Sequence, residues 1–113
     1  MNKQTLPVSI STYIEGSNKY DMDMYLSAFS DSAMIEEKSI GQDLKGKVEI
    51  QNYFLDYFIN YQTHTEIIEY KVKENVVDMR VLFKGSFPGN EIMGFYQFWL
   101  EDGKIIKLVA DLE

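Results

Sequence analysis

The sequence predicts an α+β fold in which helices pack on one face of a curved antiparallel sheet. In the first half of the chain, apolar residues recur mainly at helical spacing; from about His64 they alternate with polar residues, as in half-buried strands. Helices followed by a meander of antiparallel strands are typical of this class. With 113 residues, we expect residues 1–113 to form a single domain around one core.

Three helices are expected in the first half of the chain. Residues 5–16 form an amphipathic helix for which Gly16 is a suitable end, and Asp21 caps a short second helix that runs through Phe29. The third helix covers about 47–60 and is the most apolar of the three. The apolar face of the first helix comprises Leu6, Ile10, Tyr13 and Ile14, and that of the third comprises Ile50, Phe54, Tyr57, Phe58 and Tyr61.

Five strands are expected. Their ranges are 33–38, 68–73, 76–87, 92–101 and 104–112. A loop at 39–46 leads from the first strand into the third helix, and Asp102-Gly103 is a strong hairpin signal between the last two strands. Strand 92–101 is apolar on both faces, so we expect each face to be covered.

The composition argues against several classes of function. Eighteen acidic residues against eleven basic ones give a net charge of -7, which repels nucleic-acid phosphates and anionic lipid headgroups. We therefore expect no nucleic acid and no membrane partner. Cysteine is absent, which removes disulfides, thiolate nucleophiles and sulfur-ligated metals. The first residues contain no apolar targeting segment, which favours a cytoplasmic location.

Two further features point away from a bound metal or cofactor. The segment 41–48 approaches a phosphate-binding loop, yet Val48 offers no hydroxyl to a magnesium ion and Asp43 would repel phosphate. His64 is the only histidine, which leaves no set of histidines for a metal site. The sequence therefore predicts neither a metal nor an organic cofactor.

One acidic residue is a candidate for chemistry. Alternation along strand 33–38 places Ala33, Ile35 and Glu37 on one face, and if this smaller apolar face points inward, Glu37 enters the core. Buried carboxylates are in most cases either paired or chemically used. Glu37 is therefore the first candidate site residue.

Two tyrosines are expected to bring hydroxyl groups to the same region. Tyr13 lies on the core face of the first helix, and Tyr96 shares a strand face with Gly94 and Phe98. One acid and two phenols in an apolar chamber could move a proton and hold the resulting oxyanion. A structural hydrogen-bond network, or a Glu37 that turns out to water, fits the same pattern.

In four segments the chain resembles a SnoaL-like member of the nuclear transport factor 2-like superfamily, which includes ketosteroid isomerase. The segments span Tyr13–Asp21, Tyr25–Glu37, Leu44–Ile50 with Tyr53-Phe54, and Phe98–Ile106. The resemblance covers nearly the whole chain and rests on the order and spacing of the segments. It implies a cone, in which a strongly bent antiparallel sheet wraps around three N-terminal helices and encloses a pocket.

The resemblance also implies roles for the three candidates. Tyr13 falls where ketosteroid isomerase has its oxyanion-hole tyrosine, Glu37 where it has its aspartate base, and Tyr96 where it has a protonated aspartate. Two of the three positions differ in residue type, which weakens any link to steroids. The expected function is therefore binding of a small apolar molecule, with a cofactor-free isomerase or cyclase activity as one interpretation. The alternative is a non-catalytic ligand-binding or association module of the same fold.

A pocket and a dimer complete the expectations. Helical spacing and strand alternation predict a pocket lined by Phe54, Phe58, Phe98, Leu108 and Ala110. The opposite face of strand 92–101 presents Phe95, Gln97 and Trp99, which need cover and favour a homodimer through the outer surface of the sheet. Members of the family commonly pair in this way.

Overall fold

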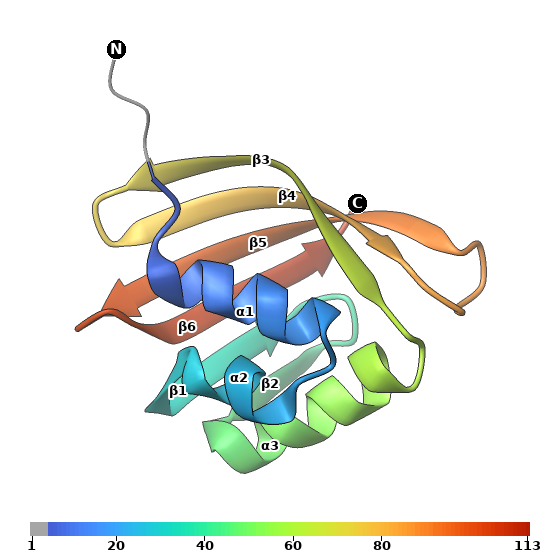
Figure 1. Cartoon of the computed structure of the whole chain (residues 1–113), viewed down its shortest axis with the longest axis horizontal. Helices are drawn as coiled ribbons and strands as arrows, with labels where there is room; N and C mark the ends of the chain where they lie inside the picture. Colours follow the sequence, from blue (N-terminus) through green and yellow to red (C-terminus); the bar gives the residue numbers. More distant parts are fainter. Residues whose placement is uncertain (1–4) are drawn as a thin grey trace.

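The computed structural model describes residues 5–113 and shows helices packed against a curved sheet (Figure 1). The helices are α1 (Val8–Asn18), α2 (Met22–Ser27) and α3 (Gly46–Phe54), the last continued by a π-helical turn η1 (Leu55–Ile59). The strands are β1 (Phe29–Glu37), β2 (Gln42–Lys45), β3 (His64–Lys73), β4 (Val76–Lys84), β5 (Glu91–Glu101) and β6 (Lys104–Leu112). The predicted α+β cone is confirmed.

The sheet differs in one respect from the predicted antiparallel arrangement. Its strand order is β2-β1-β6-β5-β4-β3, and all neighbours are antiparallel except β1 and β6, which run parallel. In the meander from β3 to β6, strand β6 has a neighbour on one side only. Strand β1, from the first half of the chain, pairs with its other edge. This parallel pair places Glu37 opposite Ala110. The sheet is therefore mixed.

The two N-terminal helices meet at a glycine. Contrary to expectation, Gly16 does not end α1, which continues to Asn18. A Cβ at position 16 would lie 2.7 Å from the backbone nitrogen of Tyr25, so glycine is needed here for the close approach of α2. The predicted cap of α2 is confirmed, because the Asp21 carboxylate accepts a hydrogen bond from the Met24 backbone N–H at 3.1 Å.

Several boundaries differ from the sequence-based expectation, among them the start of β3, at His64 and not at 68, and the end of β4, at Lys84 and not at 87. Two further differences involve β1 and β2. The second helix stops at Ser27, and β1 begins at Phe29, which pairs with Ile105 of β6. The expected loop at 39–46 contains β2, which pairs with β1 across a tight turn. Gly41 sits in that turn with φ of +65°. In both places backbone pairing with a neighbouring strand overrides the local pattern.

The third helix changes its hydrogen-bond pattern in its second half. The Asn60 N–H donates to the Leu55 carbonyl five residues back, at 3.0 Å, so the regular α-helix ends at Phe54. Phe54 and Phe58 remain buried, whereas Tyr57 and Tyr61, also expected on the buried face, are each 38% exposed. The π-helical turn therefore presents these two tyrosines at the edge of the core.

The core lies between the inner face of the sheet and the helices. Its largest fully buried side chains are Tyr13, Tyr25, Phe29, Phe54, Phe98, Ile10, Ile35, Ile50, Ile105, Leu108, Val77 and Val81. None of the helices in the described part of the chain is long and apolar enough to cross a membrane.

Candidate functional site

Glu37 is the buried acid at the end of β1. Its residue is 6% exposed, and it shares the inner strand face with Ala33 and Ile35, as the alternation predicts. Parallel pairing with β6 places it beside Ala110. The carboxylate therefore lies inside the fold and does not turn out to water.

Three hydrogen bonds hold the Glu37 carboxylate. Oε1 accepts from the Ser39 hydroxyl at 2.6 Å and from the Ser39 backbone N–H at 3.2 Å. Oε2 accepts from the Tyr53 hydroxyl at 2.5 Å. Such donors stabilise the ionised form of a carboxyl group.

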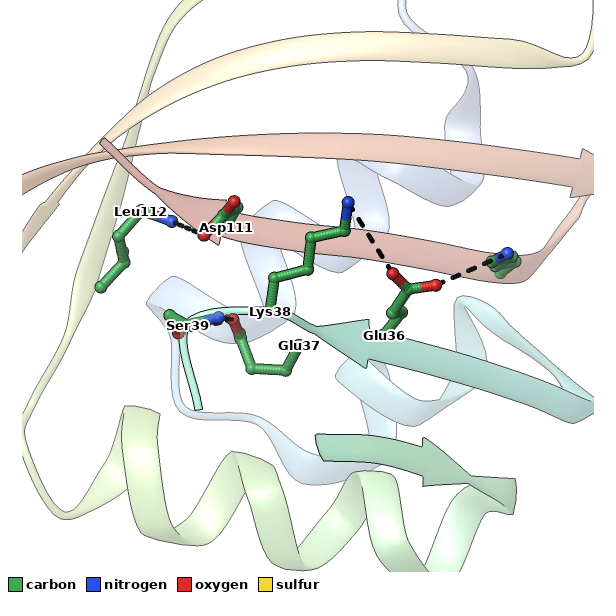
Figure 2. A network of polar contacts seen from close by, with 7 residues as sticks. Glu36, Glu37, Lys38, Ser39, Asp111 and Leu112 are labelled. Atoms are coloured by element: carbon green, nitrogen blue, oxygen red, sulfur yellow. Dashed lines mark hydrogen bonds and ion pairs between the residues drawn. The ribbon is translucent and has the colours of Figure 1, made fainter. Parts of the chain in front are cut away.

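Glu37 has no cationic partner among residues 5–113. Its neighbour Glu36 points to the other face of the strand and pairs with Lys38 at 3.9 Å and Lys107 at 3.8 Å. Figure 2 shows this division, with Glu36 near Lys38 and Glu37 turned back toward Ser39. The nearby lysines therefore pair with Glu36, and within residues 5–113 the hydrogen-bond partners of Glu37 are all neutral.

Tyr13 and Tyr96 form a second polar group in the core. The Tyr13 hydroxyl donates to the Tyr96 hydroxyl at 3.2 Å, and the rings meet edge to face at 5.5 Å between centroids. Burial is the main cause that raises the pKa of both phenols well above 10.0. Both side chains therefore stay protonated at neutral pH and remain hydrogen-bond donors.

Two further tyrosines surround this pair. Tyr25 packs against Tyr13 with ring centroids 5.0 Å apart, and burial raises its pKa well above 10.0. The two hydroxyls influence each other's pKa, yet the Tyr25 hydroxyl makes no well-formed hydrogen bond within residues 5–113. Burial and then the charge of Glu37 raise the pKa of Tyr53, whose ring is half-buried and whose hydroxyl is enclosed.

A pocket of about 290 Å³ opens beside Glu37. Its lining comprises Glu37, Ser39, Ile40, Tyr53, Tyr57, Phe58, Tyr61, Thr63, Phe83, Phe87, Pro88, Ile92, Ala110, Asp111 and Leu112. A larger groove of about 690 Å³ lies over outward-facing residues such as Arg80 and Phe95, but Glu37 does not reach it. The pocket at Glu37 is therefore the candidate site.

The structure brings together some of the expected site residues and separates others. Glu37, Phe58 and Ala110 line the pocket, and Tyr13 and Tyr96 contact each other. The three remaining residues expected to line the pocket lie in the closed core; they are Phe54, Phe98 and Leu108.

The Phe83 ring stands between the two polar groups. It lines the pocket and packs edge to face on Tyr96, with centroids 5.7 Å apart. Gly94 makes room for it, since a Cβ at that position would lie 2.5 Å from Phe83 Cε2. Neither Tyr13 nor Tyr96 lines the pocket, so a ligand at Glu37 meets Phe83 before it meets Tyr96.

Sequence reasoning missed several residues of the site. Tyr53 lies one helical turn before Tyr57 and at the edge of the expected apolar face, which was a usable signal. Ser39 follows Glu37 by two residues, the spacing at which a hydroxyl can close a turn on a carboxylate. Phe83 and Phe87 carried no comparable signal, because their approach to the helix end depends on the curvature of the sheet.

A metal site is not evident in this region. Within residues 5–113, no three side chains among His, Asp and Glu gather closely enough to hold a metal ion. The groups that the site offers are the buried carboxylate of Glu37, the exposed carboxylate of Asp111, several phenols and a wall of aromatic rings. These groups can bind an apolar molecule and accept or donate a proton.

Solved structures share this architecture. A polyketide cyclase-like protein from Sinorhizobium meliloti matches with a TM-score of 0.86 and 25% identity, over 93% of this chain and 94% of that one. A ketosteroid isomerase-like protein from Kribbella flavida matches with a TM-score of 0.83 and 8% identity, over 95% of this chain and 76% of that one. A Mycobacterium tuberculosis protein in complex with estradiol-17beta-hemisuccinate matches with a TM-score of 0.78 and 15% identity, over 91% and 89%. No protein-family model and no curated protein matches the sequence.

Each match covers more than nine tenths of this chain and at least three quarters of the other, and each agrees with the cone described above. The fold of this chain is that of the SnoaL-like and ketosteroid isomerase-like proteins of the nuclear transport factor 2-like superfamily. The resemblance noted in the sequence is confirmed at this level. The superfamily hosts unrelated activities, so function has to be argued from the pocket itself.

Proposed function

We propose that this protein binds a small, mostly apolar molecule in the pocket beside Glu37. The observation that carries the proposal is a cavity of about 290 Å³ that is walled by aromatic rings and has one buried carboxylate in its lining. Natural ligand pockets combine apolar walls with a few fixed polar groups in this way. The estradiol derivative bound by the Mycobacterium tuberculosis relative supports the same use of the cone.

A pocket-filling substitution tests this proposal. Ile92 is a half-buried residue of the lining, and Ile92→Trp should occupy part of the cavity. Calorimetric titration with a neutral bicyclic ligand such as naphthol should show affinity at least about tenfold weaker for the variant, since lost burial of a ring is worth more than 1.4 kcal/mol. The control is Val48→Trp on a residue that is 74% exposed and outside the pocket. Equal affinity in both variants would contradict the proposal.

Proton transfer at the same site is the second candidate function. Three donors occupy the Glu37 carboxylate, which has about four acceptor positions, so one remains for a substrate proton. In this mechanism Glu37 removes a proton from a carbon next to a carbonyl group, and the carbonyl becomes an enolate. Tyr96, which accepts from Tyr13, keeps its own proton for the enolate oxygen. Because Phe83 covers Tyr96, its ring must move aside for this contact.

Hydrogen exchange distinguishes catalysis from binding alone. We expect the wild-type protein to accelerate solvent deuterium incorporation into tetralone, an enolisable bicyclic ketone, and we expect Glu37→Gln to remove that acceleration. The matched control is Glu36→Gln, which changes the adjacent acid on the opposite strand face. Proton NMR follows the loss of the signal from the hydrogens on the carbon next to the carbonyl group. Equal exchange rates in wild type and Glu37→Gln would leave the non-catalytic binding module as the function.

We further propose a cytoplasmic homodimer that pairs through the outer face of the sheet. Phe95 and Trp99 on this face are 41% and 40% exposed, and the adjoining groove carries acids and bases such as Asp78 and Arg80. A two-fold axis would let these opposite charges meet across identical surfaces. Light scattering should report a dimer at micromolar concentration for the wild type and a monomer for Trp99→Lys. A wild-type monomer would refute this assembly.

A further inference from the structure

We infer that the ligand of the Glu37 pocket carries a protonated amine attached to an apolar body. This inference rests on the proposed binding function and specifies the chemical class of the ligand. Three features of the pocket support it independently: the sign of its charges, its aromatic wall, and the acceptor position left open on Glu37.

The charged residues of the lining are all acidic. Among residues 5–113, Glu37 and Asp111 line the pocket, and no lysine, arginine or histidine does. Glu37 is a buried anion whose contacts within residues 5–113 are all neutral donors. A charge in a low-dielectric site is costly to desolvate unless an opposite charge approaches it closely. A cationic ligand would supply that missing charge, and an anionic ligand would be repelled.

The wall of the pocket is suited to a cation as well. Six aromatic side chains line it, namely Tyr53, Tyr57, Phe58, Tyr61, Phe83 and Phe87. Ring contacts run from Tyr53 to Tyr57 at 5.2 Å between centroids, from Tyr57 to Tyr61 at 6.3 Å, and from Tyr61 to Phe87 at 6.2 Å. These four rings therefore form a connected surface. The faces of aromatic rings attract ammonium groups and also bury the apolar part of a ligand. The wall therefore favours both ends of an arylalkyl amine.

The acceptor position on Glu37 fits a group that donates a hydrogen. Oε1 already accepts two hydrogen bonds from Ser39, and Oε2 accepts one from Tyr53. An additional N–H donor can bond to Oε2, whereas a ligand oxygen without a hydrogen would face another acceptor and could not bond to it. The Ser39 and Tyr53 hydroxyls are themselves donating to Glu37 and are not available to such an oxygen. A protonated amine satisfies this geometry and adds charge to the hydrogen bond.

Matched ligand pairs test the inference directly. Each pair is an amine and the alcohol of the same shape: benzylamine with benzyl alcohol, naphthylmethylamine with naphthylmethanol, and biphenylmethylamine with biphenylmethanol. Calorimetric titration at neutral pH measures the affinity of each ligand for wild type, Glu37→Gln and Glu36→Gln. We expect the wild type to bind the amine of the best-fitting pair at least about tenfold more tightly than the alcohol.

The variants identify the source of this preference. Glu37→Gln should reduce the preference to about twofold or less while leaving alcohol binding in place, and Glu36→Gln should keep the wild-type preference. A second variant, Tyr57→Leu, changes a residue at the rim of the pocket that is 38% exposed. The test with this variant remains valid even if the fold does not tolerate a buried glutamine at position 37. Tyr57→Leu should lower the preference about threefold, because one aromatic face is lost.

The outcomes separate this inference from the proposed function. Alcohols that bind as tightly as their matched amines would overturn the amine class and leave the binding function standing. Failure of every pair to bind would overturn both. An amine preference that survives in both Glu37→Gln and Tyr57→Leu would show that the cation is recognised elsewhere, which also overturns the inference.

Discussion

At the scale of single residues, the energetics of Glu37 decide what the site can do. A buried carboxylate without a cation is tolerated only where hydrogen-bond donors replace the water that it has lost. Ser39 supplies two of these donors from the turn that follows β1, and Tyr53 supplies the third from α3. The carboxylate is thus fixed in place in the lining of the pocket, and the proposed binding and proton transfer both depend on this position.

The Tyr53 hydroxyl should matter for stability. Tyr53→Phe removes a charge-assisted hydrogen bond of 2.5 Å and leaves Glu37 Oε2 without its donor. We expect the free energy of unfolding, measured in urea at neutral pH, to fall by about 1–3 kcal/mol. Tyr57→Phe is the control, because it removes the hydroxyl of an exposed neighbour and should change stability by less than about 0.5 kcal/mol. Equal effects of the two substitutions would mean that the Tyr53 bond contributes nothing.

At the scale of elements, the approach of α1 to α2 depends on the absence of one side chain. Gly16 is fully covered by the backbone of α2, and a methyl group there would come within 3.0 Å of Tyr25 Cα and 2.7 Å of its nitrogen. Backbone cannot yield as a flexible side chain does, so the two helices would have to separate. Tyr25 would then shift from its stacked contact with Phe54, whose ring centroid is 4.1 Å away.

Gly16→Ala should therefore destabilise the protein although alanine is the better helix former. We expect the cost of overpacking, about 1–3 kcal/mol, to exceed the gain in helix propensity of about 1 kcal/mol. Ser11→Ala, on the exposed side of the same helix, receives the propensity gain alone and should be neutral or slightly stabilising. Thermal unfolding of the pair gives the comparison. A Gly16→Ala protein as stable as Ser11→Ala would show that α1 and α2 can move apart freely.

The elements also show how far the sequence could predict this fold. The alternation of apolar and polar residues, together with turn signals, located the four strands of the meander, and the residue type at Asp21 located the helix cap. These signals are local in the sequence. The parallel pairing of β1 with β6, and the π-helical turn that exposes Tyr57, depend on contacts between distant segments and had no local signature. Alternation placed Glu37 inside correctly. The position of Tyr53 at the edge of the expected apolar face was a signal for the site, but its bond to Glu37 could not be predicted, because that bond depends on how α3 packs against β1.

At the scale of the whole molecule, the buried phenols should make the protein less stable at alkaline pH. Burial raises the pKa of Tyr13, Tyr25, Tyr53 and Tyr96 well above 10.0. These four side chains come from α1, α2, α3 and β5, so together they join the helices to the sheet. Ionising any of them in place would put a charge into the core beside Glu37. The folded chain therefore holds these protons where the unfolded chain releases them.

Stability should accordingly be independent of these groups below about pH 9 and should fall steeply above pH 10.0, where the unfolded chain binds fewer protons than the folded one. Each phenol contributes a slope of about 1.4 kcal/mol per pH unit. Tyr25→Phe removes one of the four, and because the Tyr25 hydroxyl has no well-formed hydrogen bond within residues 5–113, the variant should stay within about 1 kcal/mol of wild type at neutral pH. Urea unfolding between pH 7 and pH 11 measures both quantities. Above pH 10.0 we expect the free energy of unfolding of Tyr25→Phe to fall less steeply with pH than that of the wild type, by about 1.4 kcal/mol per pH unit. An unchanged slope would mean that Tyr25 ionises without unfolding the chain.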